Sequence, residues 1–239
     1  MRLLSYNIHK GIGGRDRLYR LRRIVDLIAG EQPDIVCLQE VVRGTRRSRD
    51  ADQPRLLGDE FRSAVQLYQM NVHYKKQGGY GNLLLSRWPL LTKHQVSLRM
   101  GSKKPRGAQI VIIKTPRGPL RVVNWHLGLA EKERHWQVQR LLEHRLFREG
   151  GDVPTLLVGD TNDWRNTLAG GPLVDHGFAH ITKPISRFRT FPATMAVGSL
   201  DKIYLRGKVR VKRAHVVRSK LAKVASDHLP LVADLQLTR

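Results

Sequence analysis

The stretch that most constrains this chain is the apolar run 155–158, which ends in Gly159-Asp160-Thr161-Asn162. The run predicts a buried strand, and the polar residues after it place a carboxylate and a carboxamide at the edge of a sheet. There, Asp160 could orient water or bind a metal, and Asn162 could donate its amide to a phosphate oxygen. Asp and Asn are also ordinary turn formers, so the rest of the chain must decide between a turn and a site.

A strand–helix–strand pattern opens the chain. Residues 3–8 predict a buried strand that ends near Asn7, and a Gly-rich connection at 10–15 predicts a flexible turn. A helix follows, with Gly30 placed to end it and apolar residues at helical spacing: Leu18, Leu21, Ile24, Val25 and Ile28. A second buried strand at 34–38 runs into Glu40. We expect the two strands to be parallel neighbours, which would place Asn7 and Glu40 at the same sheet edge.

The rest of the chain alternates strands with few helices. Strands are predicted at 64–68, 72–75, 82–86, 93–98, 108–114, 120–125, 154–159, 200–205, 208–212 and 229–235. A helix is predicted near 131–149, short helical turns at 166–175, and an exposed Arg-rich loop at 43–55. We find no linker or repeat, so the pattern predicts a single α/β domain over 1–239 with mixed sheets.

The termini and the cysteine count point to a cytoplasmic protein. The first apolar run is too short for a signal peptide, and no apolar stretch of 18 residues occurs. The one cysteine, Cys37, lies in an apolar run and excludes an internal disulfide framework.

The charge is strongly basic. Lys and Arg number 43 against 20 Asp and Glu, a formal net charge of +23. Such an excess favours a polyanionic partner, with nucleic acid as the first expectation and an anionic membrane surface as the second. No protein partner is implied. The alternating run 208–212 predicts a strand with one cationic face, and we expect Lys208, Arg210 and Lys212 to contact a nucleic-acid backbone.

Polar residues gather at the ends of the predicted strands: Asn7, Glu40, His126, Asp160, Asn162, Asp201, Asp227 and His228. Carboxylates with an Asn supply hard oxygen ligands for Mg²⁺ or Mn²⁺, which suits water attack on a phosphoester. Zinc spacing is absent because Cys37 is alone. The Gly-x-Ser-x-Gly motif of serine hydrolases is absent too.

Six short motifs, in order, resemble those of the endonuclease/exonuclease/phosphatase superfamily: Tyr6-Asn7-Ile8, Leu38-Gln39-Glu40, Asn124-Trp125-His126, Gly159-Asp160-Thr161-Asn162, Leu200-Asp201-Lys202-Ile203 and Ser226-Asp227-His228. Each is weak alone, but together, in this order and spacing, they are specific. The resemblance implies a four-layered α/β sandwich, with two mixed β-sheets face to face and helices outside. It also implies a metal-dependent phosphoesterase related to deoxyribonucleases, exonucleases and tyrosyl-DNA phosphodiesterases.

The resemblance also implies a role for each motif residue. Asn7 and Glu40 would hold the metal, with Asp227 nearby, and Asp160 would orient or deprotonate the attacking water. Asn162 would contact the scissile phosphate, and His126 would assist the phosphate or leaving group. His228, held by Asp201, would stabilise the transition state; whether His228 or Asp160 takes the proton of the water stays open. Asn82 and Arg106 stand where the family often places phosphate- or histidine-supporting groups.

Two substrate classes remain after this comparison. The first expectation is a Mg²⁺- or Mn²⁺-dependent hydrolase, a nuclease that cleaves DNA. The alternative is a phosphodiesterase acting on phospholipid headgroups, or another small phosphoesterase, at an anionic membrane. A non-catalytic nucleic-acid-binding module would have lost at least one of the expected ligands, and none is missing.

Overall fold

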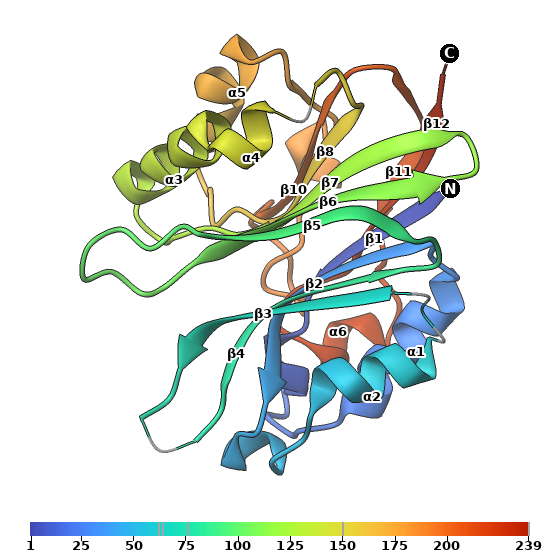
Figure 1. The fold of residues 1–239 in the computed structure, drawn as a ribbon. Coiled ribbons are helices and arrows are strands. Elements are labelled where there is room, and N and C mark those ends of the chain that lie inside the picture. The colour runs from blue at the N-terminus through green and yellow to red at the C-terminus, as the bar shows by residue number, and fades with distance from the viewer. Residues whose placement is uncertain (62, 64, 76, 150, 239) are drawn as a thin grey trace.

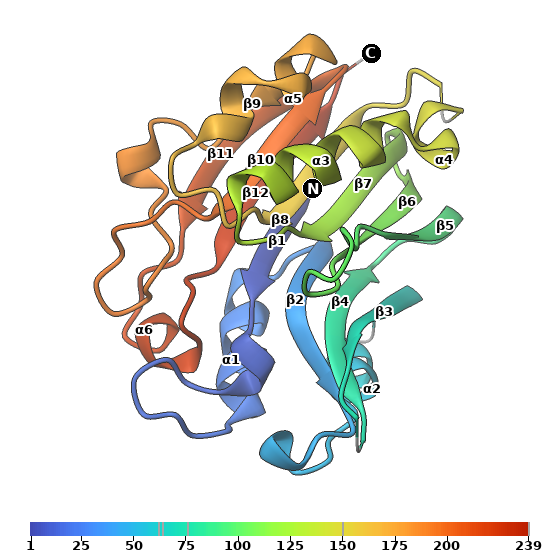
Figure 2. The same ribbon diagram turned by 90° about the vertical axis from the view of Figure 1, so that its left-hand side faces the viewer.

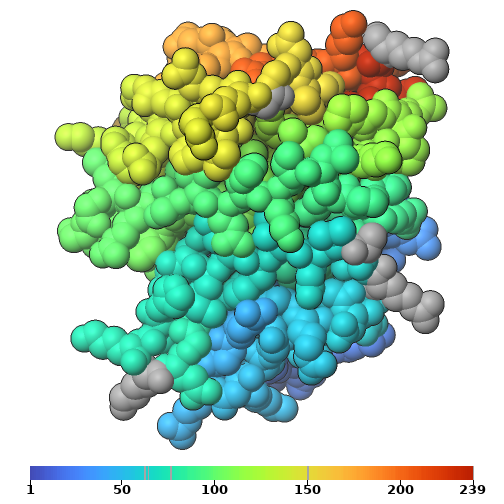
Figure 3. All heavy atoms as spheres, in the orientation of Figure 1, coloured from blue at the N-terminus to red at the C-terminus, as the bar shows by residue number. Residues whose placement is uncertain are grey.

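Two six-stranded sheets pack face to face in the computed structural model of the chain, with helices on their outer faces (Figure 1). The structure describes residues 1–61, 63, 65–75, 77–149 and 151–238. The arrangement confirms the four-layered α/β sandwich expected from the motifs. The space-filling view shows the first third of the chain, blue to cyan, below the green and yellow middle of the chain (Figure 3).

The first sheet has the strand order β11-β12-β1-β2-β4-β3. Its strands are β1 (Arg2–Asn7), β2 (Ile35–Arg43), β3 (Val65–His73), β4 (Gly79–Ser86), β11 (Val209–Val216) and β12 (Leu231–Leu237). β1 and β2 are parallel, as predicted, with Asn7 opposite Gln39. The other pairings in this sheet are antiparallel.

The second sheet has the order β5-β6-β7-β8-β10-β9. Its strands are β5 (Leu90–Ser97), β6 (Gly107–Thr115), β7 (Gly118–His126), β8 (Thr155–Asp160), β9 (Ala179–His180) and β10 (Asp201–Arg206). Here β7 and β8 form the parallel pair, with His126 opposite Asp160. Each sheet therefore has one parallel pair whose carboxyl ends carry polar residues.

Helices cover both outer faces (Figures 1 and 2). By the first sheet lie α1 (Leu21–Glu31), α2 (Gln53–Glu60) and α6 (Ala222–Ala225); by the second lie α3 (Glu131–Glu143), α4 (Arg145–Arg148) and α5 (Pro172–Asp175). Short 3-10 turns are η1 (His9–Gly11), η2 (Arg46–Ser48), η3 (Thr167–Gly170) and η4 (Ile185–Arg187). Among the described residues, no helix has both the length and the apolarity that a membrane crossing requires.

The main apolar core lies between the two sheets. One cluster of buried residues joins Leu3 and Leu38 of the first sheet to Val111, Val158 and Ile203 of the second. These strands read as nearly continuous apolar runs because both of their faces are covered. Burial on both faces fixes the relative position of the sheets and thereby of the strand ends that carry the polar residues.

Several predicted boundaries are wrong. The first helix continues through Gly30 to Glu31, and Gln32, with φ 48°, ends it in the left-handed conformation; Leu18 lies outside the helix and is exposed. The exposed loop predicted at 43–55 contains η2 and the start of α2, which Asp52 caps by accepting a hydrogen bond from the Arg55 amide. A cap followed by proline was the missed signal.

Two strand predictions and one helix prediction also change. The strands predicted at 64–68 and 72–75 form one strand, β3, with a bulge between Met70 and Val72; residue 64 lies outside the described residues. The helix predicted near 131–149 breaks at His144, whose ψ of 131° is extended, and resumes as α4. The strand predicted at 34–38 continues to Arg43 through a bulge, with a consequence for Glu40 described below.

Candidate active site

The polar strand ends converge because the two parallel pairs end on the same side of the molecule. Asn7 ends β1, His126 ends β7 and Asp160 ends β8, while Asp201 begins the antiparallel strand β10 directly opposite Asp160. Figure 2 looks toward the ends of β1 and β7. Gly159 permits this approach, since a Cβ there would stand 2.1 Å from the Trp125 carbonyl oxygen.

A cavity of about 210 Å³ lies at these strand ends. Eight of the predicted site residues line it: Asn7, Glu40, Arg106, His126, Asp160, Asn162, Asp227 and His228. Asp201 lies directly behind, fully buried. The structure therefore brings together residues that are up to 221 positions apart in the chain, from Asn7 to His228.

Asp160 is the centre of the cavity's hydrogen-bond network. Its Oδ2 accepts a hydrogen bond from Asn7 Nδ2 at 2.9 Å, and its Oδ1 accepts one from the Asn162 amide at 2.9 Å. The same Oδ2 lies 3.4 Å from His126 Nε2 and 3.7 Å from His228 Nε2. Burial raises the pKa of Asp160 to about 6, although the positive charge of His228 acts in the opposite direction.

His228 is held between two carboxylates. Its Nδ1 lies 2.8 Å from Asp201 Oδ2, and its ring packs against Phe191 with 4.9 Å between ring centroids. Burial alone would lower the pKa of His228, but Asp201 and Asp160 outweigh it and raise the pKa to about 10. The imidazole is therefore charged at neutral pH, with Nε2–H available to stabilise a developing negative charge.

His126, unlike His228, is neutral. Arg106 Nη1 lies 3.1 Å from His126 Nδ1, and because a guanidinium can only donate, Nδ1 must accept and Nε2 must carry the hydrogen. Burial, followed by the charges of Arg106 and His228, lowers the pKa of His126 well below its usual value. His126 is thus a neutral donor whose Nε2–H faces Asp160.

Glu40 reaches the cavity through a β-bulge, not from a strand end. The pairing of β2 with β4 shifts between Leu38 and Val41, and Glu40 takes a φ of 57°. A bulge redirects a side chain that regular pleating would point elsewhere. Burial alone would raise the pKa of Glu40, but the charge of Lys10 and the hydrogen bond from it outweigh burial and lower the pKa.

The donor set suits a hard divalent cation. Glu40, Asp160 and Asp227, each with a carboxylate, and Asn7, whose amide oxygen accepts a hydrogen bond from the His9 amide at 3.1 Å, all line one cavity. In the part of the chain that the structure describes, no three His, Cys, Asp or Glu side chains are close enough to enclose a metal. Mg²⁺ does not require such a cage, since it binds through one or two carboxylates and keeps waters or substrate oxygens as its other ligands. Asn7, Glu40 and Asp227 therefore fit the predicted metal.

Two of the predicted phosphate contacts have protein partners. Asn162 Nδ2 donates to the Leu127 carbonyl at 2.9 Å, so its amide ties the Asp160 loop to the end of β7. Asn82 is fully buried between the sheets, where Nδ2 donates to the Gly107 carbonyl at 2.9 Å. Asn82 is not among the residues that line the cavity. The structure thus places Asn82 as a support beneath the site, and Arg106 as the cavity residue that fixes His126.

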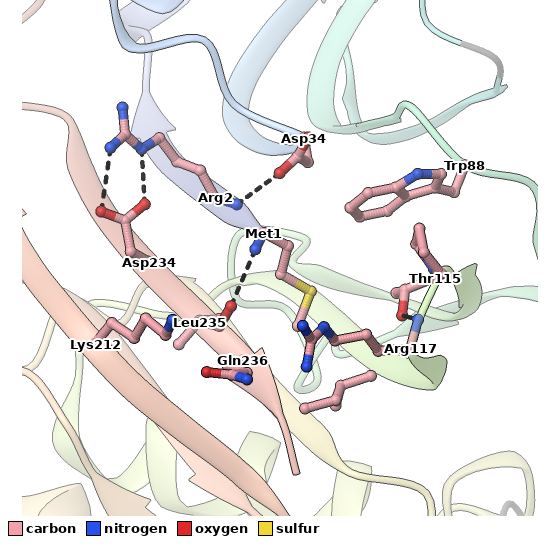
Figure 4. Close-up of a pocket in the computed structure, with 12 residues that line it drawn as sticks. Met1, Arg2, Asp34, Trp88, Thr115, Arg117, Lys212, Asp234, Leu235 and Gln236 are labelled. Atoms are coloured by element: carbon pink, nitrogen blue, oxygen red, sulfur yellow. Dashed lines mark hydrogen bonds and ion pairs between the residues drawn. The ribbon is translucent and has the colours of Figure 1, made fainter.

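The cationic strand predicted at 208–212 lies at the opposite end of the first sheet. Arg210 pairs with Gln236, whereas the residue of β12 beside Ser5 is Leu231. Lys212 lines a separate cavity of about 480 Å³ beside Met1, where Arg2 pairs with Asp234 (Figure 4). Lys208, Arg210 and Lys212 are therefore not neighbours of the strand-end cavity.

Sequence reasoning missed three further basic residues that line the cavity, His9, Lys10 and Lys104. His9 and Lys10 lie two and three residues after Asn7, and both have a positive φ, of 43° and 64°. His9 Nδ1 lies 3.8 Å from Asp227 Oδ2, and Lys104 reaches the same cavity from the loop before β6. Polar residues immediately after a strand end were the available signal, but the Gly-rich stretch after them predicted only a flexible turn.

A buried ion pair behind the site was also missed. Lys202 is fully buried, and its Nζ donates to the Asp163 carbonyl oxygen at 2.6 Å and lies 3.6 Å from Asp163 Oδ2. Burial lowers the pKa of Lys202 to about 8, although Asp163 and Asp160 act to raise it. The pair connects β10 to the loop that carries Asn162.

Comparison with known proteins agrees with this geometry. The model of the Endonuclease/Exonuclease/phosphatase family matches residues 4–228. The uncharacterized protein YbhP of Escherichia coli K12 is 31% identical over 248 residues, covering 99% of this chain and 96% of YbhP. An endonuclease/exonuclease/phosphatase from Beutenbergia cavernae has a TM-score of 0.78 at 22% identity, covering 99% of this chain and 71% of that chain.

A third relative carries a specific activity in its description. The structure of a mannosyl-6-phosphatase from Bacteroides thetaiotaomicron has a TM-score of 0.75 at 16% identity, covering 99% of this chain and 100% of that chain. At this identity the likeness shows the fold alone. From the match of the family model over residues 4–228, together with the convergence of its motif residues on one cavity, the chain belongs to the endonuclease/exonuclease/phosphatase family, whose members hydrolyse phosphoester bonds.

Proposed function

We propose that this protein is a divalent-metal-dependent phosphodiesterase that cleaves DNA by direct attack of water on phosphorus. The observation that carries the proposal is the arrangement around Asp160, which faces the neutral donor His126 and the charged donor His228 across a single small cavity. A carboxylate base opposite two donors matches the needs of in-line attack on a phosphate.

Each residue then has a separate task. His228 lies between two carboxylates and is already charged, so it donates to the phosphate and does not accept a proton. Asp160 is left as the group that orients the water and takes its proton. Asp201 keeps the His228 ring oriented, and Arg106 keeps the Nε2 hydrogen on His126. A divalent cation held by Asn7, Glu40 and Asp227 would supply Lewis-acid polarisation of the phosphate.

Cations around the cavity support a polyanionic substrate. Lys10, Lys104 and Arg106 line it, and the exposed residues Arg46 and Arg47 lie in η2, whose Ser48 donates to the Lys10 carbonyl. Together with the net charge of +23, this favours a strand of nucleic acid running past the cavity. The proposal for DNA therefore rests on the cavity rim and not on the strand 208–212.

A second candidate is a phosphomonoesterase on a small sugar phosphate. A cavity of about 210 Å³ is the right size for a phosphoryl group with its immediate neighbours, and one structural relative is described as a mannosyl-6-phosphatase. Phospholipid headgroups form the remaining class, for which the basic surface would meet an anionic membrane.

A substrate panel tests the three classes. Plasmid, single-stranded and abasic duplex DNA, a 5′-tyrosyl oligonucleotide, mannose 6-phosphate and anionic phospholipid vesicles are each incubated with Mg²⁺ or Mn²⁺, with Asp160→Ala as the matched control. We expect DNA cleavage that needs the metal, is abolished by EDTA and is absent in the variant. Phosphate release from the sugar or the lipid, with DNA left intact, would overturn the DNA proposal.

A further inference from the structure

Lys10 places a fixed positive charge inside the cavity. Its Nζ donates to Glu40 Oε2 and lies 4.7 Å from the centre of the Tyr80 ring. The Lys10 side chain is 18% exposed and that of Glu40 is 13% exposed. Lysine is rarely buried to this degree without a partner for its charge, and Glu40 is that partner here.

The backbone around Lys10 is held in an unusual conformation. His9, Lys10 and Gly11 are consecutive residues with positive φ, at 43°, 64° and 74°. Such a run is sterically disfavoured for residues with a Cβ and persists only where the surroundings enforce it. Here the Lys10 carbonyl accepts hydrogen bonds from Gln53 Nε2 at 2.8 Å and Ser48 Oγ at 3.3 Å.

These two hydrogen bonds to the Lys10 carbonyl restrict where the Lys10 ammonium group can lie. Gln53 and Ser48 are fully buried, so their hydrogen bonds hold the Lys10 backbone in the position that places its side chain in the cavity lining. Glu40 is also one of the three residues that fit the divalent cation. With a divalent cation on Glu40, the ammonium would lose its carboxylate partner, and the face of the Tyr80 ring would remain as its neighbour.

We propose that Lys10 is a substrate-binding residue that exchanges Glu40 for a non-bridging oxygen of the scissile phosphate. This inference rests on the proposed metal-dependent phosphoesterase function. Lys10 would thereby add its positive charge to those of Lys104, Arg106 and His228 around the phosphate, so that one divalent cation per chain suffices. In the protein without metal, the Lys10 ammonium neutralises the Glu40 carboxylate. A metal ion would have to displace this ammonium in order to bind Glu40.

The first measurement requires no substrate. Binding of Mn²⁺ to the full chain is measured by isothermal titration calorimetry for the wild type, Lys10→Met, Lys10→Arg and the charge-matched control Lys132→Met, whose lysine is exposed on α3. We expect one ion per chain throughout. Lys10→Met should bind Mn²⁺ roughly ten-fold more tightly, because Glu40 loses its competing cation, while Lys132→Met should match the wild type.

The second measurement uses steady-state kinetics on the substrate that the panel identifies. Lys10→Met should lower kcat/KM by about 100-fold or more, as loss of a charged phosphate contact does, and Lys10→Arg should recover at least ten-fold of it. If Lys10→Met does not unfold cooperatively, Lys10→Gln takes its place, because its amide can still donate to Glu40.

Three results would overturn the inference. They are two ions bound per wild-type chain, Mn²⁺ affinity that is unchanged or weaker in Lys10→Met, and kcat/KM equal to that of the wild type. If every panel substrate resists cleavage, the proposed function fails. Calorimetry then still shows whether Lys10 competes for the metal site, so the two failures are distinguishable.

Discussion

At the scale of single residues, the site separates two histidines by their neighbours. His228 is charged because Asp201 and Asp160 face it, and His126 is neutral because Arg106 occupies its Nδ1. Both rings point Nε2 toward Asp160 Oδ2. One carboxylate thus meets one neutral and one cationic donor, an arrangement that specifies distinct roles for chemically identical side chains.

We expect Asp201→Asn to lower kcat by about 100- to 1,000-fold, because His228 loses the carboxylate that orients it and favours its charge. The His228→Ala variant should lose at least as much. Since Asp201 acts through His228, the double variant should be no worse than His228→Ala alone. Steady-state kinetics on all three variants measures this, and losses that multiply in the double variant would contradict the assignment of Asp201 as a positioning residue.

At the scale of elements, loops tied to strands hold the site in place. The loop after β8 is anchored by Lys202 of β10, by the Asn162 side chain on the Leu127 carbonyl, and by Asp163, which accepts hydrogen bonds from the amides of Thr167 and Leu168. Because Lys202, Asp163 and Arg134 are all buried, removal of the Lys202 charge takes away one of the two cationic partners of Asp163 in a medium of low polarity.

We expect Lys202→Met to lower the free energy of unfolding by about 3 kcal/mol, because the Asp163 carboxylate keeps Arg134, also at 3.6 Å, but loses one of its two cationic partners, and the Asp163 carbonyl loses the buried ammonium donor. Asp163→Asn in the Lys202→Met background should restore part of this loss, since it removes the buried charge while the amide oxygen can still accept the hydrogen bond from the Thr167 amide. Urea denaturation of the wild type and the two variants provides the measurement. A double variant less stable than Lys202→Met would contradict the interpretation.

At the scale of the whole molecule, two pairs of exposed basic residues lie at different ends of the fold. Arg46 and Arg47 lie near the strand-end cavity, while Lys208 and Arg210 lie at the far end of the first sheet. All four are exposed, so each contributes to the long-range field. Only the first pair lies where a strand passing the cavity would contact it.

We expect the double reversal Arg46→Glu/Arg47→Glu to weaken DNA binding by more than ten-fold at about 0.1 M salt and to reduce the salt slope by about two. The matched reversal Lys208→Glu/Arg210→Glu changes the net charge equally and should have a smaller effect. Fluorescence anisotropy with a labelled duplex over a salt series measures both. Equal losses would indicate that DNA contacts the strand 208–212 as well, as the sequence predicted.

Every described strand except β9 overlaps a strand predicted from the sequence, and the polar residues at the strand ends could be predicted with them. His126 and Asp160 end neighbouring parallel strands, so their meeting follows from local pattern and sheet geometry, whereas Asn7 ends a strand of the other sheet and meets them because the two sheets pack face to face. The order of the motifs was enough to predict the two-sheet sandwich.

The positions of Lys10, Glu40 and Lys208 relative to the cavity depend on the tertiary structure. Lys10 enters it through a left-handed turn clamped by Gln53 and Ser48, Glu40 enters through a bulge, and the register of β11 carries Lys208 to the opposite end. Each position depends on a partner distant in sequence, and periodicity carries no information about such partners. The site residues at strand ends can be located from the local sequence pattern. The charges around them depend on contacts between residues that are far apart in the sequence.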